Sequence, residues 1–172
     1  MPPELHFDPS QLNFDRVLAG RKEIERVNPQ RFEMEQLTAI VHMDADQHLF
    51  AGYKDVAADE FWVRGHMPDY PLMPGVVMCE AAAQLCSYYI MTNGLMQGDF
   101  LGFGGMENVR FRGPVRPGDR LVLIAKGVKM HRRQCIFNVQ GFVGSTMVFH
   151  ADIIGVPLVR QAGAENAAEK KP

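Results

Sequence analysis

Residues 61–84 read FWVRGHMPDYPLMPGVVMCEAAAQ, and this stretch decides how the rest of the sequence is interpreted. Its first half is a loop marked by three prolines, which restrict the backbone to few conformations. Residues 76–92 then contain no proline or glycine, and they are followed by Asn93 and Gly94, a pair typical of a helix C-terminus. We therefore predict one long helix over residues 76–92. Pro74 fits near its first turn, because an N–H there would have no intrahelical acceptor.

On both sides of this stretch the sequence has the pattern of β-strands. Upstream, residues 37–43 and 48–54 flank a group of turn residues and predict a hairpin. Downstream, four segments have β-branched or aromatic residues at alternate positions. These segments are residues 101–111, 120–130, 134–143 and 146–156. One long helix followed by consecutive antiparallel strands predicts an α+β domain, with the helix buried against one face of a curled sheet.

The chain of 172 residues is long enough to bury one core without disulfides or a metal. We assign residues 1–28 to an N-terminal extension, in which residues 15–26 have the pattern of a short helix. Residues 29–158 form the predicted domain. Residues 159–172 are rich in alanine, glutamate and lysine without a core pattern, which predicts a disordered tail.

Composition excludes several classes of protein. Apolar residues make up 47% and charged residues 22%, as in soluble globular proteins, and a net charge of −2 gives no general attraction to nucleic acid or anionic membranes. The sequence has neither a signal peptide nor an apolar run of about 20 residues, which predicts a cytoplasmic protein. Cys79, Cys86 and Cys135 lack the close spacing of a zinc or redox site and suit a reducing compartment. Cys79 and Cys86 stand seven residues apart in an apolar helical pattern, which predicts core packing for both. We expect no metal and no other cofactor.

His66 is the first candidate catalytic residue. A lone histidine is more often structural than catalytic, and the other five histidines receive that interpretation. His66 differs because its proline-marked loop is restricted and because imidazole exchanges a proton near neutral pH. Gly75 stands at the predicted helix start, where the first amides have no intrahelical acceptor and suit a developing oxyanion. Simple relief of loop strain is the alternative role for Gly75.

Glu80 is the only charged side chain between Asp69 and Asp99. A carboxyl group among valine, methionine and alanine neighbours is costly to bury unless it is paired or protonated. Gln84 lies one turn later on the same helix face, within hydrogen-bonding reach. The alternative is that Glu80 points outward into solvent, but no polar stripe accompanies it along the helix.

These residues resemble the signature of the FabZ-type 3-hydroxyacyl-acyl-carrier-protein dehydratases, G-H-F-P-x-x-P-x-x-P-G-V-x-x-x-E-A-x-x-Q. Residues 106–119 are similar to the family's later R-F-x-x-P-V-x-P-G-D segment, and residues 29–37 show a weaker likeness to its opening segment. The resemblance covers about residues 29–156. Two departures, Met67 for phenylalanine and Tyr70 where histidine is frequent, alter the shape expected of the acyl tunnel but remove no catalytic group.

The resemblance implies a hotdog fold, in which a curved antiparallel sheet wraps the long helix, and dimers that associate further into hexamers. It implies that His66 of one subunit faces Glu80 of its partner as the catalytic pair. The Gly75 amide would polarise the thioester carbonyl, the backbone carbonyl near Leu72 would orient His66, and Gln84 would support the site. Glutamate at position 80, where the related dehydratase-isomerases have aspartate, argues against isomerisation.

The implied activity is elimination of water from a (3R)-3-hydroxyacyl group on acyl carrier protein, giving a trans-2-enoyl thioester in fatty acid biosynthesis. Two alternatives stay open: a hotdog acyl thioesterase, and a non-catalytic subunit that binds acyl carriers. Basic residues Lys129, Arg132 and Arg133 are either part of a docking surface for an acidic carrier protein or an ordinary solvated turn. The acyl chain length, and coenzyme A as an alternative carrier, are not decided by the sequence.

Overall fold

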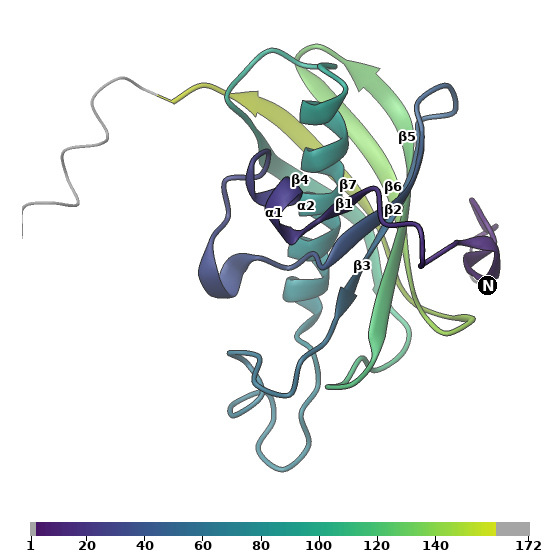
Figure 1. Cartoon of the computed structure of the whole chain (residues 1–172), viewed down its shortest axis with the longest axis vertical. Coiled ribbons are helices and arrows are strands. Elements are labelled where there is room, and N and C mark those ends of the chain that lie inside the picture. The colour runs from purple at the N-terminus through teal and green to yellow at the C-terminus, as the bar shows by residue number, and fades with distance from the viewer. Residues whose placement is uncertain (1–2, 161–172) are drawn as a thin grey trace, which may run out of the picture.

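Helix α2 (Gly75–Thr92) runs through the middle of the structure, and a curved sheet wraps round it (Figure 1). This computed structural model describes residues 3–160. The other elements, in chain order, are η1 (Pro9–Gln11), β1 (Ala19–Gly20), α1 (Arg21–Glu25), η2 (Phe32–Met34), β2 (Ala39–Asp44), β3 (Leu49–Asp55), β4 (Phe100–Phe111), β5 (Arg120–His131), β6 (Gln134–Val143) and β7 (Thr146–Leu158). The predicted helix and strands are therefore confirmed, with shifts of one or two residues at most of their ends.

Helix α2 ends where the sequence predicts. The N–H of Asn93 donates to the carbonyl of Tyr89 at 3.2 Å, and Gly94 takes a positive φ of 61°, the left-handed conformation that favours glycine. From Met78 to Ile90 nearly every side chain is buried. An apolar helix of this kind is stable only when it is surrounded by protein, and the sheet provides that cover.

The seven strands form one sheet in the order β1-β2-β3-β5-β6-β7-β4, and every neighbouring pair is antiparallel. The short β1 lies at one end of this order, and the twelve-residue β4 lies at the other. A curved antiparallel sheet around one long helix is the hotdog fold, so the predicted fold class is confirmed.

The middle of the sheet is apolar on both faces. On β5, Leu121, Leu123 and Ala125 pack in the core with α2, whereas Val122 and Ile124 belong to a second cluster. Alternate residues of a strand point to opposite faces, so this second cluster lies on the outer face of the sheet. Burial on both faces explains why β5 reads as a continuous apolar run.

The N-terminal segment covers that outer face (Figure 1). Leu12 is buried in the second cluster, the ring of Phe7 stacks on His42, and Phe14 meets Tyr53 edge to face. Its backbone is fixed as well, because the side-chain amide of Gln140 donates to the carbonyl of Glu4 at 2.7 Å and accepts from the N–H of His6 at 3.1 Å. The N-terminal segment therefore stabilises the fold by packing on the outer face of the sheet.

The predicted helix over residues 15–26 is wrong for most of its length. The structure has a helix only at Arg21–Glu25, because Ala19 and Gly20 pair with β2 as a strand. The side chain of Glu23 accepts from the N–H of Gly20 at 3.0 Å and so caps this short helix. Sheet pairing therefore overrides the local helical pattern.

Replacing Leu12 with alanine is expected to lower the free energy of unfolding by about 2 kcal/mol, since a buried leucine loses its apolar contacts and leaves a void. Urea unfolding followed by circular dichroism measures this change. Leu5→Ala in the same segment is the matched control, because Leu5 is 50% exposed and its loss should change stability by no more than about 0.5 kcal/mol. Equal effects of the two substitutions would contradict a covering role.

Cys79, Cys86 and Cys135 are buried and unpaired, so the expected core packing of the first two is confirmed. Residues 161–172 of the predicted tail lie outside the described residues, and the division into extension, domain and tail stays a prediction. Within residues 3–160 no helix is long and apolar enough to cross a lipid bilayer.

Candidate active site

The loop between β3 and α2 holds His66 in a defined orientation. The His66 carbonyl accepts from the N–H of Leu72, and the imidazole Nδ1 lies 2.8 Å from the carbonyl of Leu72. The N–H of Met73, in turn, donates to the carbonyl of Val115 at 2.8 Å, which ties the loop to the segment after β4. The contact with Leu72 that the resemblance implies is thus present.

This contact also determines the tautomer of His66. A carbonyl oxygen only accepts hydrogen bonds, so Nδ1 carries the hydrogen and the neutral ring has its free lone pair on Nε2. The side chain lines a cavity of about 540 Å³, together with Met73, Gly75 and Phe111. An exposed imidazole with a free Nε2 beside a cavity is suited to take a proton from a bound substrate.

The N-terminus of α2 brings free amides to the same cavity. Among the described residues, the N–H groups of Gly75 and Val76 have no backbone acceptor, whereas the N–H groups of Val77 and Met78 donate to the carbonyl of Pro74. A helix N-terminus carries a partial positive charge. Gly75 therefore lies where an oxyanion donor is needed.

The structure leaves no room for a side chain at Gly75. A Cβ built on it would lie 2.5 Å from the ring of Phe111, which stacks on Phe149 with ring centroids 5.7 Å apart. The ring therefore packs directly against the helix start. Sequence reasoning did not find this contact, because 36 residues separate its two members.

Gly75→Ala is expected to lower kcat by about 10²-fold, since the new methyl group must displace the Phe111 ring or shift the amides that face the cavity. Steady-state kinetics measure the effect. Gly65→Ala is the matched control from the same loop, because a Cβ there meets nothing within 4 Å. Unchanged kcat in Gly75→Ala would remove the Gly75 amide from the site.

Glu80 is half-buried and hydrogen-bonded rather than pointing freely into solvent. Its Oε1 accepts from the side-chain amide of Gln84 at 2.7 Å, as the one-turn spacing predicts, and from that of Gln30 at 3.3 Å. Both bonds use the same oxygen, which leaves Oε2 without a hydrogen-bond partner among residues 3–160. Oε2 is therefore the oxygen that remains available to hydrogen-bond another group.

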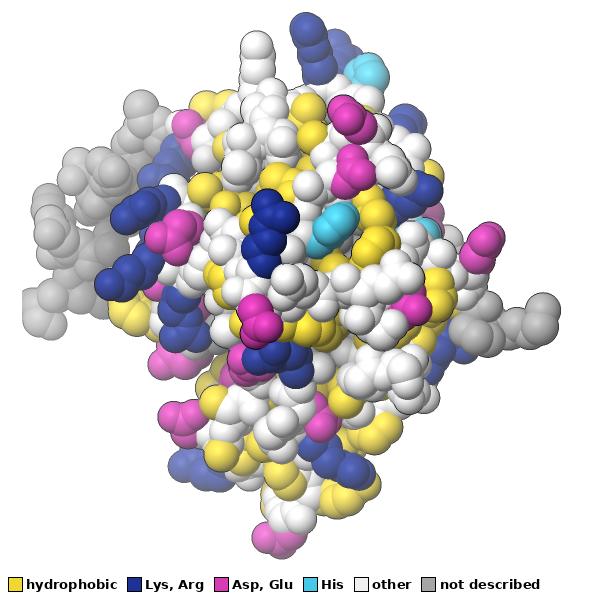
Figure 2. Space-filling view, turned by 45° about the vertical axis from the view of Figure 1, so that its right-hand side comes forward, with side chains coloured by type: hydrophobic (Ala, Val, Ile, Leu, Met, Phe, Trp, Pro, Cys, Tyr) yellow, Lys and Arg dark blue, Asp and Glu magenta, His cyan; other side chains and the backbone are white. Residues whose placement is uncertain are grey.

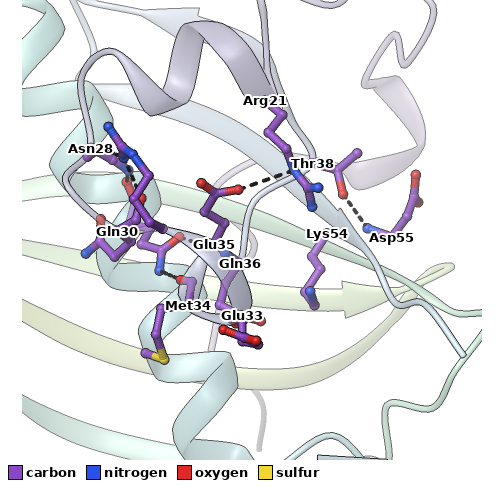
Figure 3. Close-up of polar contacts among 12 residues, drawn as sticks. Arg21, Asn28, Gln30, Glu33, Met34, Glu35, Gln36, Thr38, Lys54 and Asp55 are labelled. Carbon is purple, nitrogen blue, oxygen red and sulfur yellow. Dashed lines mark hydrogen bonds and ion pairs between the residues drawn. The ribbon is translucent and has the colours of Figure 1, made fainter. Parts of the chain in front are cut away.

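Gln84 is fixed by the segment that precedes β2. Its amide nitrogen donates to the carbonyl of Met34 at 2.6 Å, and its amide oxygen accepts from the N–H of Gln36 at 2.8 Å. The side chain of Asn28 donates to the Gln84 backbone carbonyl at 2.9 Å. Figure 3 shows Asn28, Met34 and Gln36 gathered along this segment. Backbone partners on both sides set the direction of the Gln84 amide, so it presents N–H to Glu80.

Gln30 is a site residue that sequence reasoning missed. It comes from the same segment (Figure 3) and reaches Glu80 across the fold. The only signal for it was the weaker family likeness over residues 29–37.

Within one chain, the structure does not bring His66 and Glu80 to the same cavity. His66 lines the large cavity at the start of α2, whereas Glu80 lines a smaller one with Gln30, Ala83 and Ser87. Neither residue appears in the lining of the other cavity. The two groups therefore line separate cavities of one chain.

Cys79, the neighbour of Glu80, is not a nucleophile. Burial raises the pKa of the Cys79 thiol to about 11, so the thiol stays protonated at neutral pH. The candidate reactive side chains are therefore the His66 imidazole and the Glu80 carboxyl group.

Basic residues lie on two parts of the surface. Lys129, Arg132 and Arg133 are exposed around the β5–β6 turn, roughly 30 Å along β5 from the end of the sheet that carries the His66 loop. Arg112 and Arg116, in contrast, follow Phe111 of the His66 cavity, and Arg116 lies over the ring of Tyr70 at 4.8 Å. Elsewhere acidic and basic side chains are interspersed, as Figure 2 shows for one face.

The chain is similar to a known family and to several of its members. The profile of the FabA-like domain matches residues 28–152. The 3-hydroxyacyl-[acyl-carrier-protein] dehydratase FabZ of Clostridium beijerinckii is 37% identical over 109 residues, which cover 63% of this chain and 77% of the relative. The protein of the same name from Clostridioides difficile is 30% identical over 132 residues, covering 77% of this chain and 92% of the relative.

Solved structures share the fold at lower identity. The dehydratase heterocomplex ApeI:P from Xenorhabdus doucetiae matches with a TM-score of 0.65 and 13% identity, over 78% of this chain and 90% of that one. The sigma28-regulated virulence protein Cj0977 from Campylobacter jejuni matches with a TM-score of 0.60 and 20% identity, over 81% and 93%. These similarities concern the architecture alone.

Proposed function

The chain belongs to the FabA-like domain family, and from this premise we propose that it is a (3R)-3-hydroxyacyl-[acyl-carrier-protein] dehydratase of fatty acid biosynthesis. The observation that carries the proposal is the His66 imidazole, oriented by Leu72 with Nε2 free, beside the free amides that begin α2. Base and oxyanion donor thus face one cavity.

The proposed reaction uses these groups in fixed roles. Nε2 of His66 removes a proton from C2 while the Gly75 N–H hydrogen-bonds the thioester carbonyl, whose oxygen gains negative charge. Glu80 acts as the general acid and gives a proton to the 3-hydroxyl, the C3–O bond breaks, and water leaves as the C2–C3 double bond forms. A general acid or base contributes about 10² to 10⁴ in rate, and an oxyanion donor about 10² to 10³.

Separate cavities for His66 and Glu80 support a site shared between two subunits. Strand β4 lies at the end of the sheet order, and unpaired strand edges are templates for pairing with another chain. Phe103, Met106 and Phe111 of β4 are between 41% and 51% exposed, and Val76 at the start of α2 is 68% exposed. We propose a homodimer through this edge, in which Glu80 of the partner subunit completes the His66 site.

The proposed carrier is acyl carrier protein, as named for the relatives from Clostridium beijerinckii and Clostridioides difficile. Arg112 and Arg116 beside the His66 cavity support this, since acidic partners are steered by nearby basic side chains. Arg112 also donates to the Nδ1 of His150 at 3.2 Å. Burial, and then the charges of Arg112 and Arg110, lower the pKa of His150. The His150 ring is therefore neutral at neutral pH, and the positive charge of this surface comes from the arginines.

One assay separates this function from the alternatives. The purified chain is incubated with 3-hydroxybutyryl and crotonyl carrier protein, and the products are separated by mass. Reversible interconversion of the two is the expected result. Release of free acid would indicate a thioesterase, and binding without reaction would indicate a non-catalytic subunit; either result overturns the proposal.

A further inference from the structure

The smaller cavity beside Glu80 has a polar feature that the proposed reaction does not use. Glu80, Ala83 and Ser87 follow one another at three- and four-residue spacing and therefore line one face of α2. The cavity has a volume of about 40 Å³. The rest of its wall comes from Gln30 and from β4 and β7, with Leu101, Phe103 and Ile153 among the lining residues. Three polar side chains, Glu80, Ser87 and Gln30, therefore converge on one cavity beside apolar residues of the sheet, and convergent polar groups are typical of a site that orients a ligand.

Ser87 is buried in that wall without a hydrogen-bond partner. Its residue is 3% exposed, and neither a backbone nor a side-chain group among residues 3–160 pairs with its Oγ. The amide oxygen of Gln30, which lines the same cavity, is also buried and unpaired. Leaving a buried polar group without a hydrogen bond destabilises the fold, because the group has lost its contact with water. Alanine at position 87 would carry no such cost, so the hydroxyl calls for a partner that enters the cavity.

The position of Ser87 indicates what that partner is. Ser87 lies two helical turns beyond Glu80, about 10 Å along the helix axis. In the proposed reaction Glu80 meets the substrate at C3, so the acyl chain beyond C3 must extend from Glu80 into the space next to it. The apolar side chains of this wall suit methylene groups, and Ser87 is the hydrogen-bonding group farther along the helix.

We propose that Ser87 determines acyl-chain specificity: its hydroxyl hydrogen-bonds an oxygen on the acyl chain, so the preferred substrate carries a second hydroxyl or a carbonyl beyond C3. This inference rests on the proposed dehydratase function. A site built to hydrogen-bond a substrate group discriminates strongly against an analogue without it, because its own polar group is then left unpaired.

The test uses a set of carrier-bound substrates of one length. The set contains 3-hydroxydodecanoyl carrier protein and matched chains that carry one further hydroxyl group at successive carbons beyond C6. The expected result for the native chain is a kcat/KM at least about tenfold higher for one of the hydroxylated chains than for the plain chain. In Ser87→Ala this ratio falls to about one, because the plain chain gains and the hydroxylated chain loses.

Two control variants distinguish the hydrogen-bonding role of the Ser87 hydroxyl from the space that its side chain fills. Ser87→Cys keeps nearly the same volume but offers only a weak donor, so the ratio should fall without a gain for the plain chain. Ser145→Ala, in the exposed β6–β7 turn, should leave the ratio unchanged. No preference for any hydroxylated chain, or the same ratio in Ser87→Ala, overturns the inference and assigns the cavity to water. Conversion of 3-hydroxybutyryl carrier protein by the native chain is measured in parallel. Its absence would overturn the proposed function, whereas conversion without a preference for a hydroxylated chain would overturn only the role of Ser87.

Discussion

His66→Ala is expected to reduce kcat/KM for dehydration at least a thousandfold while the chain stays folded and its assembly is unchanged. The substitution removes the imidazole Nε2, for which no other side chain of the same cavity can substitute as a base. His66 is exposed, and its ring makes a single hydrogen bond to the Leu72 carbonyl, so little stability depends on it. Steady-state kinetics with 3-hydroxybutyryl carrier protein measure kcat/KM, and light scattering measures the oligomeric state.

The matched control for His66 is His131→Ala. His131 is exposed at the end of β5, far from the cavity, and its loss should change kcat/KM less than twofold. Retention of most activity in His66→Ala would remove the proposed mechanism. Loss of activity together with the assembly would instead indicate a structural role for the loop.

Glu80→Gln is expected to lower kcat by about 10² to 10³-fold with little change in KM. Glutamine has nearly the same shape, and its amide oxygen can still accept from Gln84 and Gln30, so the cavity is preserved. What is lost is the proton that the carboxyl group gives to the departing hydroxyl. Glu33→Gln is the control, since Glu33 is exposed on the short helix η2, away from both cavities. Equal kinetics of the Glu80 and Glu33 variants would exclude Glu80 as the acid.

Mixing the two inactive variants tests whether the site is shared. A dimer of one His66→Ala chain and one Glu80→Gln chain keeps one intact pair, from the His66 of one chain and the Glu80 of the other. Random reassortment makes about half of the dimers mixed, each with one of its two sites intact, so about a quarter of the native activity should return. If both groups act within one chain, mixing restores nothing.

The sequence predicted the long helix and the strands correctly, and it pointed to the candidate catalytic residues, because each left a local signal. Three prolines after His66, the lone charge of Glu80 among small apolar residues, and the one-turn spacing to Gln84 all lie within 19 residues. Their hydrogen-bonding consequences follow from helix geometry, which repeats every 3.6 residues. The Glu80–Gln84 contact therefore follows from the sequence alone.

Contacts between distant segments had no such signal. The ring of Phe111 over Gly75, the reach of Gln30 to Glu80 and the cover that Leu12 gives to the outer sheet face join residues between 36 and more than 100 positions apart. The helical pattern over residues 15–26 was misleading for the same reason, because pairing of Ala19 and Gly20 with β2 is a tertiary interaction.

Periodicity and residue chemistry are properties of short segments, so the fold class and the candidate catalytic residues could be predicted from the sequence. Which side chains share a cavity could not be predicted: His66 and Glu80 line different cavities of one chain, and the Ser87 hydroxyl lines the same cavity as the Glu80 carboxyl group. Side chains on separate elements take positions that follow from sheet register and helix packing, and these depend on the whole core at once.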